Sequence, residues 1–202
     1  MNALVVFTHG KESAPWGSKF QHLADIAARR GANVISPDYR DLESPEARVE
    51  RLLSLQLPPY DQLVLVGSSM GAYVATLASQ ALQPDGLFLL APAFYLPGYA
   101  NQDPAPHSPH VLAVHGWGDE LIPPENVLRF GKRHHATVVF TEGDHRLATA
   151  LPTIGSLFDD FLARQILRLP GDDASSDRTH DAGLGARERD YFERSDRNPD
   201  RS

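Results

Sequence analysis

The chain has 202 residues, about 1.3 times the roughly 150 residues of a common domain, so we expect one globular domain with a short addition. It carries 19 Lys and Arg against 26 Asp and Glu, a formal net charge of -7, which disfavours binding to nucleic acid or to anionic lipid. There is no cysteine, which excludes disulfides, thiolate nucleophiles and Cys-bound zinc. No basic leader follows Met1, and no apolar run approaches the ~18 residues that span a bilayer. We therefore expect a soluble cytoplasmic protein that does not bind a membrane.

The composition changes sharply near the C-terminus. Residues 171–202 contain nine acidic and six basic residues but only two Leu, Ile, Val or Phe. So few apolar side chains cannot build a core. We therefore assign 1–170 to one folded domain and 171–202 to a charged, disordered tail. An alternative is that 186–194 forms a short helix that docks through Tyr191 and Phe192.

Within the folded domain, short apolar runs alternate with segments in which apolar residues recur every three or four positions. The runs predict six strands: Ala3–Thr8, Asn33–Ser36, Gln62–Val66, Gly86–Leu90, His110–Val114 and Ala136–Phe140. The periodic segments predict five helices, which begin near Phe20, Pro45, Met70, Pro124 and Pro152. This alternation predicts a doubly wound, mostly parallel six-stranded α/β sheet with helices on both faces. Functional groups of such sheets lie beyond the carboxyl ends of the strands.

A G-x-S-x-G motif separates the third predicted strand from the third helix, as Gly67-Ser68-Ser69-Met70-Gly71. Glycine two residues before and after the serine lets the chain double back sharply, which exposes the serine hydroxyl above the sheet. The helix that begins at Met70 directs free N–H groups and the positive end of its dipole to the same place. Ser69 is therefore the candidate nucleophile. The alternative is a Gly/Ser turn that caps the helix or holds an anion.

A serine nucleophile needs a general base, and the base needs a carboxylate that fixes its tautomer. Asp119 lies a few residues past the fifth strand and His145 a few residues past the sixth, so both are candidates. Glu120 is an alternative acid, and Asp119 could instead cap the turn that follows it. His145 could be a loop histidine in solvent. Asp144 is a poor acid for this base because adjacent side chains point apart.

We expect the other histidines to have structural roles. His9 and His115 each precede a glycine at a strand end and are expected to be packed and hydrogen-bonded in the interior. The remaining pairs lack a third ligand at metal spacing: His134 with His135, and His107 with His110. We therefore expect no metal site and no cofactor.

Together these features resemble the α/β-hydrolase superfamily, and most closely its small lidless bacterial esterases. The resemblance rests on the elbow motif, on the chain order of serine, acid and histidine, and on an opening strand followed by His9-Gly10 with Ser13 nearby. It covers essentially residues 3–169.

The resemblance implies the position of an oxyanion hole, and it shows two differences between this chain and larger relatives. The oxyanion hole would be formed by the backbone N–H groups of Lys11 and Met70. The chain starts at the third strand of larger relatives. Residues 91–108, about 18 in number, connect the fourth and fifth strands where relatives insert a cap, so we expect a minimal fold without a cap domain.

The activity that the resemblance implies is that of a serine carboxylesterase, which cleaves small-molecule esters of short acyl groups through an acyl-enzyme on Ser69. Aromatic residues on loops at the same sheet edge could form an apolar acyl pocket, although any one of them could instead pack within its loop and close the edge of the core: Trp16, Phe94, Tyr95, Tyr99 and Trp117. The alternatives are a thioesterase, acyltransferase or peptidase with the same three residues, or a non-catalytic binding protein that keeps the fold.

Overall fold

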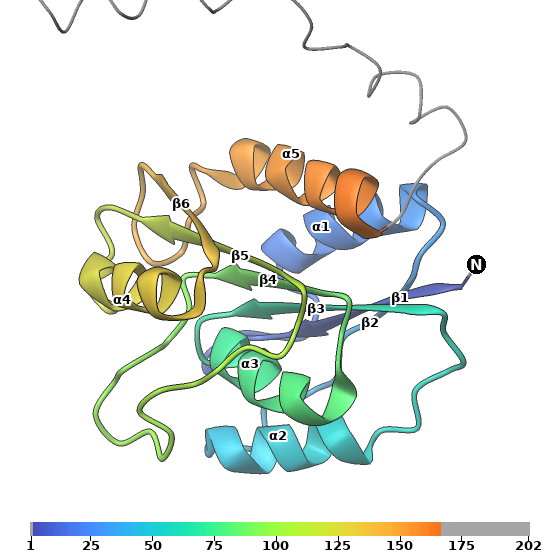
Figure 1. Ribbon diagram of the computed structural model, residues 1–202, viewed down its shortest axis with the longest axis horizontal. Helices are drawn as coiled ribbons and strands as arrows, with labels where there is room; N and C mark the ends of the chain where they lie inside the picture. Colours follow the sequence, from blue (N-terminus) through green and yellow to red (C-terminus); the bar gives the residue numbers. More distant parts are fainter. Residues whose placement is uncertain (1, 167–202) are drawn as a thin grey trace, which may run out of the picture. The chain divides into compact units, whose positions relative to one another are not determined.

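The computed structural model describes residues 2–166, which form a parallel sheet with helices on both faces (Figure 1). Within these residues the sheet has six strands in the order β2-β1-β3-β4-β5-β6, and every neighbouring pair is parallel. The strands are β1 (Ala3–Thr8), β2 (Asn33–Ile35), β3 (Gln62–Ser68), β4 (Gly86–Leu90), β5 (His110–Gly116) and β6 (Thr137–Thr141). The predicted six-stranded α/β sheet is confirmed, and its strands are parallel throughout.

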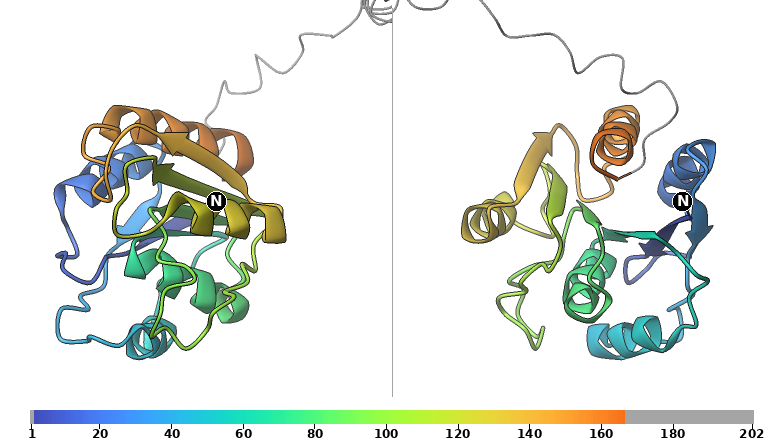
Figure 2. Two further views of the ribbon diagram at one scale, coloured as in Figure 1. Left: turned by 90° about the vertical axis from the view of Figure 1, so that its left-hand side faces the viewer. Right: turned by 45° about the vertical axis from the view of Figure 1, so that its right-hand side comes forward.

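Helices cover the two faces of the sheet unequally. Residues 2–166 contain α1 (Ser18–Arg29), α2 (Pro45–Ser54), α3 (Met70–Leu82), α4 (Pro124–His134) and α5 (Leu151–Phe161). Helices α1 and α5 pack on one face, and α2, α3 and α4 lie on the other (Figure 1 and Figure 2). Local sequence sets where they begin. In α2, for example, the side chain of Ser44 accepts the Ala47 N–H and Pro45 occupies the first helical position.

Alternate side chains of the central strands enter two different cores. In β1, Val5 and Phe7 pack on the side of α1 and α5, whereas Leu4 and Val6 pack on the side of α2 and α3. All residues of β1 and β4 are buried because both faces are covered. Each fully buried aliphatic or aromatic side chain of this kind contributes about 1.5–3 kcal/mol to folding. The two cores fix the register of the sheet and the direction of every loop at its carboxyl edge.

The boundaries of most elements agree with the predicted ones to within two residues. Strands β3 and β5 extend past their predicted ends to Ser68 and Gly116, because these residues still have partners in the ladder. A short π-helix, Leu162–Ile166, follows α5. The predicted tail, 171–202, and its alternative helix with Tyr191 and Phe192 lie outside the described residues.

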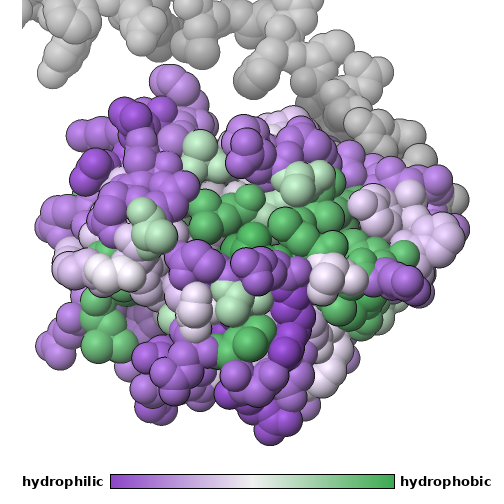
Figure 3. Space-filling model, turned by 90° about the horizontal axis from the view of Figure 1, so that it is seen from below, coloured by the Kyte–Doolittle hydropathy of each residue, from purple (hydrophilic) through white to green (hydrophobic). Residues whose placement is uncertain are grey.

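Two further properties of the described chain concern its hydrophobic residues. In residues 2–166, no helix is both long enough and apolar enough to cross a membrane. Seen from the side of α2, the surface has hydrophobic residues near its centre and hydrophilic residues around them (Figure 3). Apolar atoms form much of any protein surface, so we infer no partner from this face.

Because all strands are parallel, the loops that follow β1, β3, β4, β5 and β6 meet at one edge of the sheet. Strands β1 and β3 are neighbours, but the chain leaves them toward opposite sides, since β2 lies beyond β1 and β4 lies beyond β3. Such a switch in strand order opens a crevice at the carboxyl ends. The structure therefore places the candidate residues of the sequence around this crevice.

Candidate active site

Ser69 occupies the sharp turn between β3 and α3, with φ 56° and ψ -122°. A non-glycine residue adopts this conformation at a cost in energy, and such strain is typical of functional positions. Two glycines make the turn possible. A Cβ atom at Gly71 would overlap the carbonyl of Thr8, and one at Gly67 would overlap the backbone of Ala72. The elbow therefore needs glycine at both positions for steric reasons.

Backbone hydrogen bonds hold the serine in this conformation. The Ser69 N–H donates to the carbonyl oxygen of Leu90 at 2.9 Å, and the Ser69 carbonyl accepts the Ala93 N–H at 3.2 Å. The hydroxyl of Thr8 donates to the Gly71 carbonyl at 2.8 Å and so connects β1 to the start of α3. The elbow is thus bound to both neighbouring strands, which fixes the position of Oγ.

The His145 ring lies between Ser69 and Asp119. Its Nε2 is 3.0 Å from Ser69 Oγ, and its Nδ1 is 2.8 Å from Asp119 Oδ2. The carboxylate can only accept, so Nδ1 carries the proton and Nε2 is free to accept the serine hydroxyl proton. This is the arrangement that a serine nucleophile with a histidine base requires.

Asp119 is buried, with a relative exposure of 5%, in the loop between β5 and α4. Its Oδ1 accepts the N–H groups of Leu121 and Ile122, each at 2.9 Å. These bonds orient the carboxylate and leave Oδ2 for the imidazole. The alternative acid Glu120 is exposed, and Asp144 accepts the N–H of Arg146 in its own loop at 2.9 Å.

The two other histidines near this edge have structural partners, as expected. The Nδ1 of His9 donates to the Gly10 carbonyl at 2.8 Å, and its Nε2 accepts the Tyr39 N–H at 2.9 Å. His115 donates from Nε2 to the carbonyl of Ile122 at 3.0 Å. Burial lowers the pKa of both histidines below the ordinary value, which keeps them neutral at neutral pH.

Lys11 and Met70 carry the backbone N–H groups predicted to form the oxyanion hole. Both residues line the cleft that contains Ser69 and His145, and within residues 2–166 neither N–H has a hydrogen-bond partner. The Gly10 carbonyl, in contrast, accepts from His9 Nδ1 at 2.8 Å and from the Ser13 N–H at 3.3 Å. The Gly10 carbonyl and the Lys11 N–H belong to the same planar trans peptide group and point in opposite directions. Hydrogen bonds that fix the direction of the carbonyl therefore also fix the direction of the N–H.

The sequence of the chain matches a known protein family. The model of the "Alpha/beta hydrolase family" matches residues 5–193. The chain belongs to the alpha/beta hydrolase family. No curated protein matches it.

Solved structures agree with this assignment. A Xanthomonas campestris pv. campestris protein ascribed to the alpha/beta hydrolase superfamily is 28% identical, with a TM-score of 0.68 over 80% of this chain and 97% of its own. An esterase from Pyrococcus furiosus is 20% identical, with a TM-score of 0.63 over 81% of this chain and 83% of its own. A Xanthomonas campestris serine hydrolase without a lid is 23% identical, with a TM-score of 0.57 over 84% of each chain.

The cleft of this alpha/beta hydrolase has a volume of about 1280 Å³ and lies between the loops at the carboxyl edge. No helix occurs between β4 and β5 in the described chain, so the cleft has no helical cap. Apolar side chains form part of its wall: Met70, Leu96, Tyr99, Leu121, Ile122, Leu147 and Leu151.

The predicted aromatic pocket needs correction, because Tyr99 is the one member of that set among the lining residues. Phe94 is fully buried and packs against Phe130, with ring centroids 4.4 Å apart. Tyr95 lies under the guanidinium of Arg129, at 4.0 Å.

The two tryptophans also face other partners. Trp117 stacks on Phe140 with ring centroids 4.2 Å apart, and Trp16 lies beside Phe7 at 6.0 Å. The sequence placed these residues on the correct loops but could not determine which way each side chain points. Each of the four packs against another side chain, and none of them lines the cleft.

Sequence reasoning missed Arg48, whose side chain is 1% exposed. Its Nη1 donates to the carbonyls of His9 at 3.2 Å and Gly10 at 3.3 Å, and its Nη2 to that of Lys11 at 3.4 Å. The guanidinium also donates through Nε to Leu42 at 2.8 Å. Arg48 therefore fixes the loop that presents the Lys11 N–H. One signal was available, since Arg48 lies four residues before the buried Leu52 on the apolar side of α2.

Sequence reasoning also missed Lys19, in the first turn of α1. It lines the cleft, and its Nζ donates to Ser68 Oγ at 3.2 Å, beside the elbow serine. Burial lowers its pKa to about 8, although the negative charges of Asp144 and Asp119 oppose the shift. No pattern in the sequence marks this lysine, because a cation before an apolar helical stripe is ordinary.

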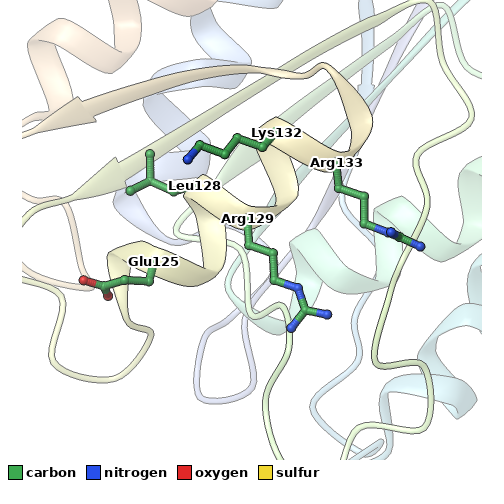
Figure 4. A pocket seen from close by; sticks show the side chains of 5 residues that line it. All are labelled: Glu125, Leu128, Arg129, Lys132 and Arg133. Atoms are coloured by element: carbon green, nitrogen blue, oxygen red, sulfur yellow. The ribbon is translucent and has the colours of Figure 1, made fainter.

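A second hollow, on the outer side of α4, has a different character (Figure 4). It is lined by residues of that helix alone: Glu125, Leu128, Arg129, Lys132 and Arg133. It contains no nucleophile and lies on an open surface, so it is not the candidate active site. In the part of the chain that is described, no three His, Asp or Glu side chains are grouped as a metal site requires.

Proposed function

We propose that the protein is a serine carboxylesterase that cleaves small-molecule esters of short acyl groups. The observation that carries this proposal is the continuous hydrogen-bonded chain from Ser69 Oγ through the His145 ring to the buried Asp119. Esterases among the structures of similar fold are consistent with this activity. The cleft without a helical cap favours short acyl groups, because each added methylene gains binding energy only while it is covered by protein.

The first half of the reaction forms the acyl-enzyme. Ser69 Oγ attacks the ester carbonyl while His145 Nε2 takes the hydroxyl proton, and the carbonyl oxygen becomes an oxyanion. The N–H groups of Met70 and Lys11 donate to this oxyanion, and Asp119 stabilises the imidazolium. The bond to the alcohol then breaks, and the alcohol oxygen leaves with the proton from His145.

The second half releases the acid. A water molecule gives a proton to His145 and attacks the acyl carbonyl, through a second oxyanion held by the same N–H groups. The bond to Ser69 Oγ breaks, His145 returns the proton to the serine, and the carboxylic acid leaves. The cycle ends with Ser69 and His145 in their starting protonation states.

The test is hydrolysis of 4-nitrophenyl butyrate by Ser69→Ala. We expect kcat to fall by about 10³-fold or more, because the covalent step and its base partner are lost together. Ser156→Ala is the matched control, since that hydroxyl is exposed on α5 and donates to the Pro152 carbonyl. Turnover by Ser69→Ala above about a tenth of the wild-type rate would contradict the proposal.

A further inference from the structure

The charged side chains that line the cleft differ in their exposure. Three are cationic and three are anionic: Lys11, Lys19 and Arg146, and Glu12, Glu120 and Asp144. All except Lys19 are exposed to solvent. Water screens the exposed charges, whereas a partly buried charge keeps more of its field. The cation that acts most directly on a bound ligand is therefore Lys19.

The surroundings of Lys19 leave its charge without a direct ionic partner. Its Nζ donates one hydrogen bond, to the neutral hydroxyl of Ser68. Within residues 2–166 no carboxylate lies at ion-pair distance from it, and the first turn of α1 has no acidic residue. An ammonium group has three donors, so two remain for a ligand. At pH 7, below its pKa of about 8, the group is largely charged.

A purely structural role does not account well for this arrangement. Removing an ammonium group from water is unfavourable, and the hydrogen bond to Ser68 together with the attraction of Asp144 and Asp119 compensates only part of that cost, since the pKa of Lys19 stays lowered. A ligand that brings a negative charge would compensate it and would form charge-assisted hydrogen bonds. The position of Lys19 at the cleft wall, beside the elbow, allows such a ligand to reach it.

We propose that Lys19 determines substrate specificity by binding a carboxylate, or a similar small anion, carried by the substrate itself. This inference rests on the proposed esterase function of Ser69. Ser68 and Ser69 are adjacent, with Cα atoms about 3.8 Å apart, and both line the cleft with Lys19, so an anion at Lys19 and the scissile carbonyl at Ser69 fit within one small molecule. The preferred substrates are therefore half-esters of short dicarboxylic acids or esters of small carboxylated alcohols.

The test compares anionic and neutral esters of similar size at pH 7 and low salt. For an anion on the acyl side, 4-nitrophenyl hemiglutarate is compared with 4-nitrophenyl pentanoate. For an anion on the alcohol side, 3-acetoxybenzoate is compared with 3-acetoxybenzamide. We expect wild-type kcat/KM to favour the anion by about tenfold or more in one pair, as one charge-assisted hydrogen bond allows.

Variants of charged residues then test whether Lys19 causes the preference for anionic over neutral esters. In Lys19→Met the anionic-to-neutral ratio should fall to near one, and in Lys19→Arg most of the preference should remain. Lys132→Met, on the outer side of α4, is the control for a general loss of one positive charge and should keep the wild-type ratio. Arg146→Met removes an exposed cation of the cleft, and it should change the ratio less than about twofold because water screens that charge.

Several results would overturn the inference. A wild-type enzyme that hydrolyses the neutral esters but does not prefer either anion contradicts the role of Lys19 and leaves the esterase function intact. An equal loss of preference in Arg146→Met and Lys19→Met would assign it to the general field of the cleft instead. If the wild-type protein hydrolyses none of the four esters, the proposed function fails and the inference fails with it.

Discussion

The elbow that carries Ser69 and the neighbouring loop after β1 are held in place in different ways. The elbow between β3 and α3 is fixed by contacts between backbones, since Gly67 and Gly71 leave no room for a Cβ atom. The loop after β1, residues 9–17, is largely exposed and is held from below by the guanidinium of Arg48. Local sterics therefore position the candidate nucleophile, whereas hydrogen bonds, among them those of one long side chain from another helix, position the predicted oxyanion donor.

This difference has a consequence for how each loop responds to mutation. A backbone packed directly on another backbone cannot relax without moving a strand or a helix. A loop held largely by hydrogen bonds from side chains can shift while the sheet stays intact. Damage at the elbow should therefore appear first in stability, and damage beneath the β1–α1 loop should appear first in the rate.

Gly71→Ala, at the elbow, should have the largest effect on stability. The new Cβ would overlap the Thr8 carbonyl, so α3 and β1 must separate. We expect the free energy of unfolding to fall by about 3 kcal/mol or more, measured by urea denaturation. Gly17→Ala is the matched control in the other loop. Its Cβ would have 3.9 Å to the nearest atom, so the loss should stay below about 1 kcal/mol. Equal losses in the two variants would refute the distinction between the loops.

Arg48→Met should have a smaller effect on stability and a clear effect on the rate. The change leaves the carbonyls of His9, Gly10 and Lys11 without this donor, at a cost of about 1–3 kcal/mol. Because the peptide that carries the Lys11 N–H then keeps only the bonds from His9 and Ser13 to its Gly10 carbonyl, its direction is less well fixed, and kcat for 4-nitrophenyl butyrate should fall by about 10- to 100-fold with KM nearly unchanged. The assay is run well below the Tm of the variant.

Arg51→Met separates positioning by Arg48 from general destabilisation of α2. Arg51 lies on the same helix but is bonded to Asp41 and to the Asp38 carbonyl, not to the carbonyls of the loop after β1. We expect Arg51→Met to lower Tm slightly and to leave kcat unchanged. If Arg48→Met loses stability but keeps kcat, Arg48 supports the fold alone and does not position the oxyanion donor.

Most of the fold could be predicted because its signals are local. The apolar runs of β1, β3 and β4 match strands buried on both faces, and the Gly-Ser pattern around Ser69 matches the turn that the glycines permit. The positions of Asp119 and His145 after consecutive strands predicted that both would reach the same edge of a parallel sheet. The structure brings their side chains into hydrogen-bond contact with each other and with Ser69.

The walls of the cleft could not be predicted, because they depend on contacts between distant segments. Arg48 reaches carbonyls 37 to 39 residues away in the chain, and Lys19 reaches a serine 49 residues away. The sequence also could not show that Phe94 points into the core while Tyr99 lines the cleft. Residue type and loop position indicated where the pocket is, but side-chain packing decides which residues form it.

The central claim is that Ser69 is a nucleophile activated by His145. The most direct measurement is to label the folded protein with a fluorophosphonate probe and to locate the adduct by peptide mapping. We predict one covalent adduct, on Ser69, and its loss in His145→Ala, because the serine hydroxyl then has no base to take its proton. Folded protein that is not labelled, or a stable adduct on another serine, would contradict the account and would favour a protein that keeps the fold for binding alone.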